Sequence, residues 1–425
     1  MAELYKLTAS EAAALMEKNE ITSEDLVRAC LARIEEREET VQAWQYLDPD
    51  FAIDEARKAD AAERKGPLHG IPFATKDIID TADMPTEIGS PIYAGRRPDA
   101  DAPCVAAMRD AGAVLMGKTV TTEFATFNPG KTRNPHNSGH TPGGSSSGSG
   151  AAVGDCMVPL AFGSQTAGSL IRPAAFCGAY GLKPTHGTVD LSGILPLEAT
   201  LDTLGYMARS VDDLATYYAT VRGLTPEPVP DGIGRAPRVG LCRTPYWNKA
   251  QPETVEAVED AAARFTELGA EITDAVLPDT YADIHESHRV ILNRGLTVTL
   301  GHEYDEHRNQ LSERLQTMIS NGLEISDERY RAAVEHADAC RTGLDDAFAE
   351  FDIFLAPSAP GEAPEGLGMT GDPVFQLPWT TLHAPCITIP YDTGPKGLPV
   401  GIQLIGRQRN DDTVLAVAKW FDARR

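Results

Sequence analysis

Two loops rich in small and hydroxyl-bearing residues stand out in the first half of the chain. Gly143–Gly150 reads GGSSSGSG and Gly163–Ser169 reads GSQTAGS, with an apolar run between them. Glycine lets a backbone approach a ligand closely, and exposed amides beside a serine are what an acyl-transfer site requires. A flexible linker has a similar composition. The apolar continuation Ala151–Val153 and the second loop favour a serine hydrolase over a linker.

A serine nucleophile needs a base, and Lys76 is one candidate. It lies in the apolar strand pattern of residues 71–77, IPFATKD. Desolvation there would lower the pKa of the lysine towards the range of a general base. The residue types alone favour a different interpretation, in which Lys76 forms an ion pair with Asp77 or another carboxylate.

Two motif matches point to other functions. Residues 112–119 (GAVLMGKT) match the P-loop pattern, but the apolar residues inside the match predict a buried strand instead of a phosphate-binding loop. The segment GSSSG at residues 144–148 matches the nucleophile elbow of α/β-hydrolases, with Ser146 as nucleophile and Asp202 and His383 as its partners. The irregular stretch before it lacks the strand that an elbow requires, so this match is weak.

The histidines form no metal-binding pattern. His136 and His140 are four residues apart, but nearby proline and glycine residues prevent a helix. The segment from His302 to His307 misses the H-E-x-x-H spacing by one residue. We therefore expect no metal and no cofactor.

Taken together, several segments resemble the amidase signature family. They are Gly70–Asp77, Pro142–Ser146, Gln165–Ala175, Gly181–Thr185, Leu201–Gly205 and Gly397–Leu404. The resemblance runs from about residue 66 to the C-terminus and is least distinctive over residues 225–350. It implies an α/β amidase-signature fold, with a central twisted mixed β-sheet sandwiched between α-helices.

The resemblance also implies a Ser–Ser–Lys triad. In it, Ser169 is the nucleophile, Ser145 relays the proton after a cis Gly144–Ser145 peptide bond, and Lys76 is the base. Ser146 and Gly144 are expected to support the site. The oxyanion hole would consist of backbone amides, those of Thr166, Ala167, Gly168 and Ser169.

Two positions depart from the family pattern. Ala167 stands where glycine is usual, so its amide remains usable if its φ is negative. Arg172 follows the nucleophile by three residues instead of two, a register similar to the malonamidase-like branch. In that branch the arginine is implicated in holding a substrate carboxylate, which suits a guanidinium. An internal salt bridge that braces the nucleophile loop is an equal alternative.

These features imply an amidohydrolase that cleaves the C–N bond of a small amide through a seryl acyl-enzyme. An amide acid such as malonamate is the first expectation for the substrate. Aryl or aliphatic amides and carbamates are the alternatives, followed by the amidase subunit of a glutamine-dependent amidotransferase. A non-catalytic binding protein is disfavoured because Lys76, Ser145 and Ser169 are all present.

Strand and helix patterns alternate along the chain, which predicts an α/β sheet covered by helices on both faces. We expect a single domain across residues 1–425. Its parts are N-terminal helices (1–65), a signature core (66–224), a more variable helical substrate-side segment (about 225–350) and a return to the sheet (351–425). A capping-box pattern predicts a helix that starts after Thr8, and Ser23 or Thr22 can cap a second helix over residues 26–34.

Composition limits the partners. A net charge of −24 would repel the phosphate backbone of nucleic acids, and no run of about 18 apolar residues predicts a membrane span. Seven scattered cysteines without a C-x-x-C pair, and an N-terminus unlike a signal peptide, predict a cytoplasmic protein. The expected partner is a small-molecule amide, and the resemblance is compatible with a homodimer.

Overall fold

An 11-stranded sheet forms the centre of the computed structural model, which describes residues 3–425. The strand order is β1-β3-β2-β4-β6-β5-β10-β11-β9-β7-β8. The strands are β1 (Trp44–Leu47), β2 (Pro72–Lys76), β3 (Val114–Thr119), β4 (Leu160–Gln165), β5 (Tyr180–Lys183), β6 (Thr203–Ala208), β7 (Arg238–Leu241), β8 (Glu271–Asp274), β9 (Ile353–Pro357), β10 (Cys386–Thr393) and β11 (Pro399–Ile405).

The sheet is mixed, as the sequence predicts. Strand β2 is parallel to both β3 and β4, and β7 is parallel to both β8 and β9. The other pairings are antiparallel. Because β2 and β4 are parallel neighbours, their carboxyl ends reach the same edge of the sheet. The segment expected to be helical, residues 225–350, also contributes β7 and β8, so it extends the sheet as well as covering the site.

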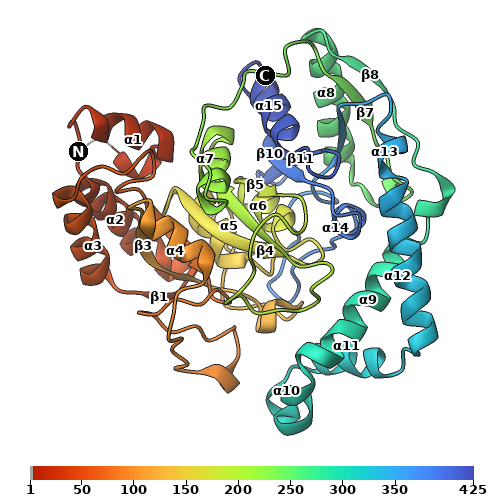
Figure 1. Ribbon diagram of the computed structural model, residues 1–425, viewed down its shortest axis with the longest axis horizontal. Coiled ribbons are helices and arrows are strands. Elements are labelled where there is room, and N and C mark those ends of the chain that lie inside the picture. Colours follow the sequence, from red (N-terminus) through yellow and green to blue (C-terminus); the bar gives the residue numbers. More distant parts are fainter. Residues whose placement is uncertain (1–2) are drawn as a thin grey trace.

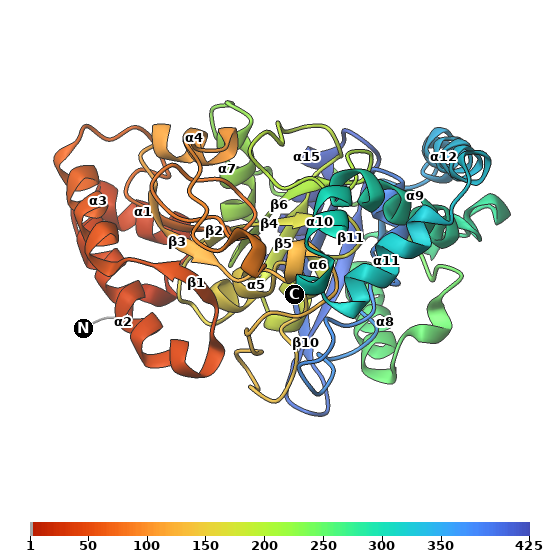
Figure 2. The ribbon, with the colours of Figure 1, turned by 90° about the horizontal axis from the view of Figure 1, so that it is seen from below.

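Helices lie around this sheet (Figures 1 and 2). They are α1 (Ala9–Glu17), α2 (Ser23–Val41), α3 (Pro49–Ala61), α4 (Pro103–Asp110), α5 (Ser147–Gly154), α6 (Ile171–Cys177), α7 (Val211–Val221), α8 (Pro252–Glu267), α9 (Ile284–Thr299), α10 (Gly301–Glu306), α11 (Glu313–Leu323), α12 (Asp327–Thr342), α13 (Leu344–Ala347), α14 (Leu377–Thr381) and α15 (Asp411–Asp422). Thr8 forms the capping box of α1, as predicted, and of the two candidates for the second cap it is Thr22 that caps α2, also in a capping box. Within residues 3–425, no helix combines the length and apolar character needed to cross a membrane.

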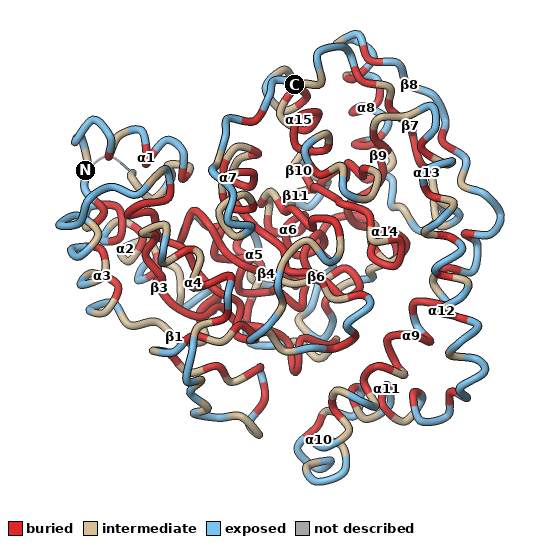
Figure 3. Tube along the Cα trace, in the orientation of Figure 1, coloured by how far each residue is buried: buried red, intermediate tan, exposed pale blue. Residues whose placement is uncertain are grey.

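The buried core follows the sheet and two short central helices, α5 and α6 (Figure 3). Helix α5 consists largely of small residues because it packs closely against α6. A Cβ atom on Gly150 of α5 would lie 2.9 Å from the carbonyl oxygen of Pro173 in α6. Gly143, just before α5, has a φ of +82°, and a Cβ there would lie 2.7 Å from Pro173 Cα. The Gly/Ser composition of this stretch is therefore a packing requirement.

Helices α9–α12 form an arm that extends from the body of the molecule (Figure 1). The arm also contacts the N-terminal half of the chain. The Tyr93 hydroxyl donates to Glu303 of α10, and Ser312, which caps α11, donates to Glu123 through its amide at 2.8 Å. These bonds join the arm to the segment that precedes the serine loops.

Candidate active site

Lys76 is the last residue of β2 and is completely buried. Its Nζ donates to Ser145 Oγ at 2.6 Å and to Ser164 Oγ, near the end of the neighbouring β4, at 2.8 Å. Burial lowers the pKa of Lys76 to about 7, although Asp202 opposes this shift. A buried amine whose acceptors are two hydroxyls is suited to exchange protons with them.

The ion pair favoured by residue types alone is not formed by Lys76. The carboxylate of Asp77 lies 3.5 Å from Nζ of Lys118, a buried lysine of β3. The register pairs Thr75 with Lys118, and successive residues of a strand point to opposite faces. Lys118 therefore lies on the face opposite Lys76. Its strand contains the P-loop match, which confirms that this match is a buried strand.

Ser145 and Ser146 lie between the cis Gly144–Ser145 peptide bond and α5. Ser145 is buried and its hydroxyl bonds to Lys76, whereas the hydroxyl of Ser146 bonds to backbone atoms. Ser146 Oγ accepts from Ser164 N at 3.1 Å and donates to Ser164 O at 3.3 Å. Ser146 N also donates to Ser169 O at 3.2 Å, which joins the two serine loops.

The loop from Thr166 to Ser169 connects β4 to α6, and all four of its carbonyl oxygens accept hydrogen bonds. His288 of α9 donates to Thr166 O at 2.8 Å, and Thr380 of α14 donates to Ala167 O at 2.7 Å. Arg172 N donates to Gly168 O, and the Ser146 amide to Ser169 O, both at 3.2 Å. These contacts fix the orientation of each peptide unit in the loop.

The backbone amides of this loop, unlike its carbonyl oxygens, are largely without hydrogen-bond partners among residues 3–425. Among residues 3–425, no protein acceptor contacts the amides of Ala167, Gly168 or Ser169. Ala167 has a negative φ, so the alanine that replaces the usual glycine keeps its amide in an ordinary backbone conformation. Ser169 is half-buried, and it is the last residue before α6 apart from Leu170. The loop thus presents several uncommitted donors beside a serine.

Arg172 is buried in α6, and its contacts are with the main chain. Its Nε donates to Thr370 O at 2.7 Å, and its Nη2 donates to Gly144 O at 2.7 Å. Burial lowers the pKa of this guanidinium to about 10, while the charge of Asp372 acts in the opposite direction. The bracing expected from a salt bridge is therefore supplied by bonds to carbonyl oxygens. One of these belongs to the residue before Ser145.

The α/β-hydrolase alternative is not assembled, because its three residues have separate partners. Ser146 bonds to the backbone of Ser164, and His383 Nε2 bonds to Thr200 O at 2.7 Å. Asp202 accepts from Thr166 Oγ1 at 2.5 Å and from the amides of Leu197 and Glu198. This alternative was wrong, since a nucleophile, base and acid must contact one another.

The histidines considered as metal ligands also bond to the main chain. His136 Nε2 contacts Cys177 O at 2.9 Å, and His140 Nδ1 contacts Ala363 O at 2.7 Å. The described residues, 3–425, contain no group of three or more His, Cys, Asp or Glu side chains placed to hold a metal ion.

Sequence reasoning missed three contributors to the site. In the sequence Ser164 resembles any small residue of a buried strand. Its position five residues before Ser169 was the one weak sign of a role in the site. His288 and Thr380 lie more than a hundred residues from the loop that they hold, and no motif contains them. Their contacts exist only because α9 and α14 pack against the end of β4.

Comparison with known proteins identifies the family and supports the fold. The Amidase family model matches residues 25–415, and the chain belongs to this family. A glutamyl-tRNA(Gln) amidotransferase subunit from Chloroflexus aurantiacus is 34% identical over 469 aligned residues, covering 98% of this chain and 96% of its own. The chain is an amide-hydrolysing enzyme of the amidase signature type.

Solved structures support the same assignment. A peptide amidase in complex with the competitive inhibitor chymostatin is 30% identical, with a TM-score of 0.86, and the match covers 99% of this chain and 98% of that one. A 6-aminohexanoate cyclic dimer hydrolase in complex with its substrate is 25% identical, also with a TM-score of 0.86, over 99% of this chain and 97% of that one. These relatives share the fold but differ in their named substrates.

The contacts of Arg172 make a prediction about stability. Substitution of Arg172→Met should lower the free energy of unfolding by about 2–6 kcal/mol, because two buried carbonyl oxygens lose their donor at about 1–3 kcal/mol each. Urea denaturation followed by circular dichroism measures this change. Arg289→Met removes an exposed arginine bonded to Glu286 and should cost less than about 1 kcal/mol. Equal losses in the two variants would contradict the bracing role.

Proposed function

We propose that this chain hydrolyses a small amide through an acyl-enzyme on Ser169, with Ser145 and Lys76 as the proton relay. The observation that carries the proposal is the 2.6 Å bond between Lys76 Nζ and Ser145 Oγ, made by a lysine that bonds no carboxylate among residues 3–425. The uncommitted amides beside Ser169 support it further.

The relay begins with neutral Lys76. Lys76 takes a proton from Ser145, Ser145 takes the proton of Ser169, and Ser169 Oγ attacks the amide carbon. The oxygen of the tetrahedral intermediate becomes an anion. Ser145 then donates a proton to the leaving nitrogen and regains one from Lys76, so that the C–N bond breaks and the amine departs. Water, deprotonated by the same relay, releases the acid and restores Ser169.

The oxyanion would be held by backbone amides from Thr166 to Ser169. One such donor typically contributes about 3–4 kcal/mol to the transition state. The bonds to the loop carbonyls support this role, because they orient the peptide units before the substrate arrives. Preoriented donors need no reorganisation as the charge develops.

An amide-acid substrate such as malonamate would depend on Arg172. Two nitrogens of Arg172 already hold carbonyl oxygens, and only Nη1 has no partner among the described residues. We therefore propose that Arg172 positions the backbone next to Ser145 and does not select the substrate. Neutral aliphatic or aryl amides and carbamates then become the favoured substrates.

The roles of the serines can be separated by substitution. Ser169→Ala should reduce kcat for a simple amide by about 10⁴-fold or more, as expected for loss of a nucleophile. Ser146→Ala should reduce kcat much less, because Ser146 bonds only to backbone atoms. Steady-state ammonia release and labelling by a fluorophosphonate give the two readouts. Full activity in Ser169→Ala, or labelling on Ser146, would contradict the proposal.

The lysine should set the pH dependence. Burial lowers the pKa of Lys76 to about 7, and only its neutral form accepts a proton. We therefore expect kcat/KM to rise with pH through about 7 and then to level off. The carboxylate of Asp202 favours the charged lysine, so Asp202→Asn should shift the rise to lower pH. If kcat/KM did not change with pH between about 6 and 8, Lys76 would not be the base.

A second candidate is the amidase component of an amidotransferase, because the curated relatives are named as subunits of glutamyl-tRNA(Gln) amidotransferases. Such a component would hydrolyse glutamine efficiently only within its complex. We expect the purified chain to hydrolyse simple amides alone and to show little glutaminase activity. Co-purification of a second protein from the native host, with glutamine hydrolysis that depends on it, would favour this second candidate.

A further inference from the structure

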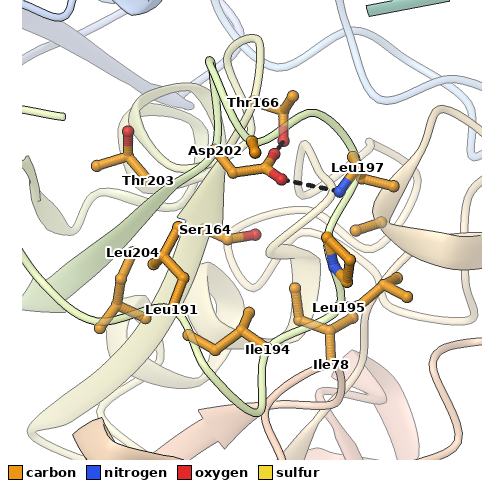
Figure 4. Close-up of a pocket in the computed structure, with 13 residues that line it drawn as sticks. Ile78, Ser164, Thr166, Leu191, Ile194, Leu195, Leu197, Asp202, Thr203 and Leu204 are labelled. Carbon is orange, nitrogen blue, oxygen red and sulfur yellow. Dashed lines mark hydrogen bonds between the residues drawn. The ribbon is translucent and has the colours of Figure 1, made fainter. Parts of the chain in front are cut away.

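A cavity of about 120 Å³ adjoins the serine–lysine cluster. Its wall includes Ser164, whose hydroxyl accepts from Lys76 Nζ, and Thr166, the first residue of the proposed oxyanion loop. In Figure 4 the Ser164 hydroxyl points into the space between Asp202 and Ile194. The cavity is therefore placed to receive part of a molecule that reacts at this site.

Most of the wall is aliphatic. Ile78 follows β2, Leu191, Ile194 and Leu195 come from the segment between β5 and β6, and Leu204 lies in β6. Among the described residues that form the wall, none carries an aromatic ring or a cationic group. Such a surface gains free energy by contact with an apolar group, and it offers nothing to neutralise an anion.

The ionisable group in the wall is an acid, Asp202. Its oxygens are held by Thr166 Oγ1 at 2.5 Å, Leu197 N at 2.8 Å and Glu198 N at 3.0 Å. These bonds fix the carboxylate at one end of the cavity (Figure 4). A carboxylate on the substrate would meet this like charge, and Arg172 does not contribute to the wall. The cavity therefore selects against amide acids.

We propose that this cavity binds a neutral aliphatic substituent of the amide substrate, with about four to five carbons. The size follows from the volume, because an apolar cavity of about 150 Å³ holds a benzene molecule. This inference rests on the proposed amidase function and adds a substrate class to it. Asp202 sets the polarity of the substituent, and the aliphatic residues set its length.

Two series of amides test the proposal. One lengthens the acyl chain of primary amides from acetamide to octanamide, and the other lengthens the alkyl group of N-alkyl acetamides. In the series whose variable group enters the cavity, kcat/KM should rise about fourfold per methylene up to about five carbons and then fall. Either series can show this optimum, and the one that does identifies the side of the scissile bond that faces the cavity.

A matched pair of substrates tests the charge. Glutaramate is pentanamide with a carboxylate in place of the terminal methyl group. We expect kcat/KM for glutaramate to be at least about a hundredfold lower, because like charges brought together cost several kcal/mol. Malonamate should also be a poor substrate.

A substitution in the cavity wall tests whether the variable substituent binds in this cavity. Ile194 is only partly buried, so Ile194→Ala should fold and should move the optimum chain length upward by one or two carbons. Leu224→Ala changes a half-exposed leucine outside the cavity and should leave the optimum unchanged.

The outcomes separate this inference from the proposed function. Turnover without a length optimum in either series, or preference for glutaramate or malonamate, would overturn the inference and leave the amidase function intact. An optimum that Ile194→Ala does not move would also overturn it. Absence of both amide turnover and fluorophosphonate labelling of Ser169 would overturn the proposed function itself.

Discussion

The site depends on one electrostatic constraint, a buried lysine that bonds no carboxylate in the described part of the chain. Lys76 and Lys118 lie on neighbouring strands and are both buried, but their environments differ. Lys118 has the carboxylate of Asp77 within 3.5 Å, together with carbonyl and hydroxyl acceptors. Lys76 has two serine hydroxyls at hydrogen-bond distance. Because an ammonium in such a place is poorly compensated, burial favours the neutral amine, which can accept a proton.

The same constraint explains why the neighbouring loop is held so firmly. A proton relay through two serines operates only if the oxygen atoms remain within hydrogen-bond distance of one another. Hydrogen bonds from distant elements hold the two serine loops: α9 and α14 hold the loop after β4, and Ser146 joins that loop to the one before α5. Arg172 Nη2 donates to the carbonyl oxygen of Gly144, the residue before Ser145. These contacts direct carbonyl oxygens into the protein and leave amides beside Ser169.

Much of this arrangement could be predicted from the sequence, and the failures have physical reasons. The helix caps at Thr8 and Thr22 and the buried strand around Lys118 follow from local patterns of capping and hydrophobicity, whereas the mixed sheet was implied by the family resemblance. The supposed pair between Lys76 and Asp77 is excluded by a local rule as well, since adjacent residues of a strand point to opposite faces. Strands β7 and β8 were missed because each has only four residues, and the pairing of such short strands decides their structure more than their own propensity does. His288 and Thr380 could not be found from one sequence, because their role arises from packing between segments far apart in the chain.

In the proposed function, the reaction and the substrate selectivity depend on different parts of the fold. Lys76, Ser145 and Ser169 lie at the ends of β2 and β4 and before the two central helices, where close backbone packing leaves little freedom for change. The cavity wall comes largely from the segment between β5 and β6, which carries no catalytic group.

Asp202 links the loop after β4 to the cavity wall. It bonds to Thr166 in the loop and to the amides of Leu197 and Glu198 beside the cavity. A change of substrate can therefore arise from the wall without disturbing the relay. Relatives with names as different as peptide amidase and glutamyl-tRNA(Gln) amidotransferase are similar to this chain over nearly its whole length.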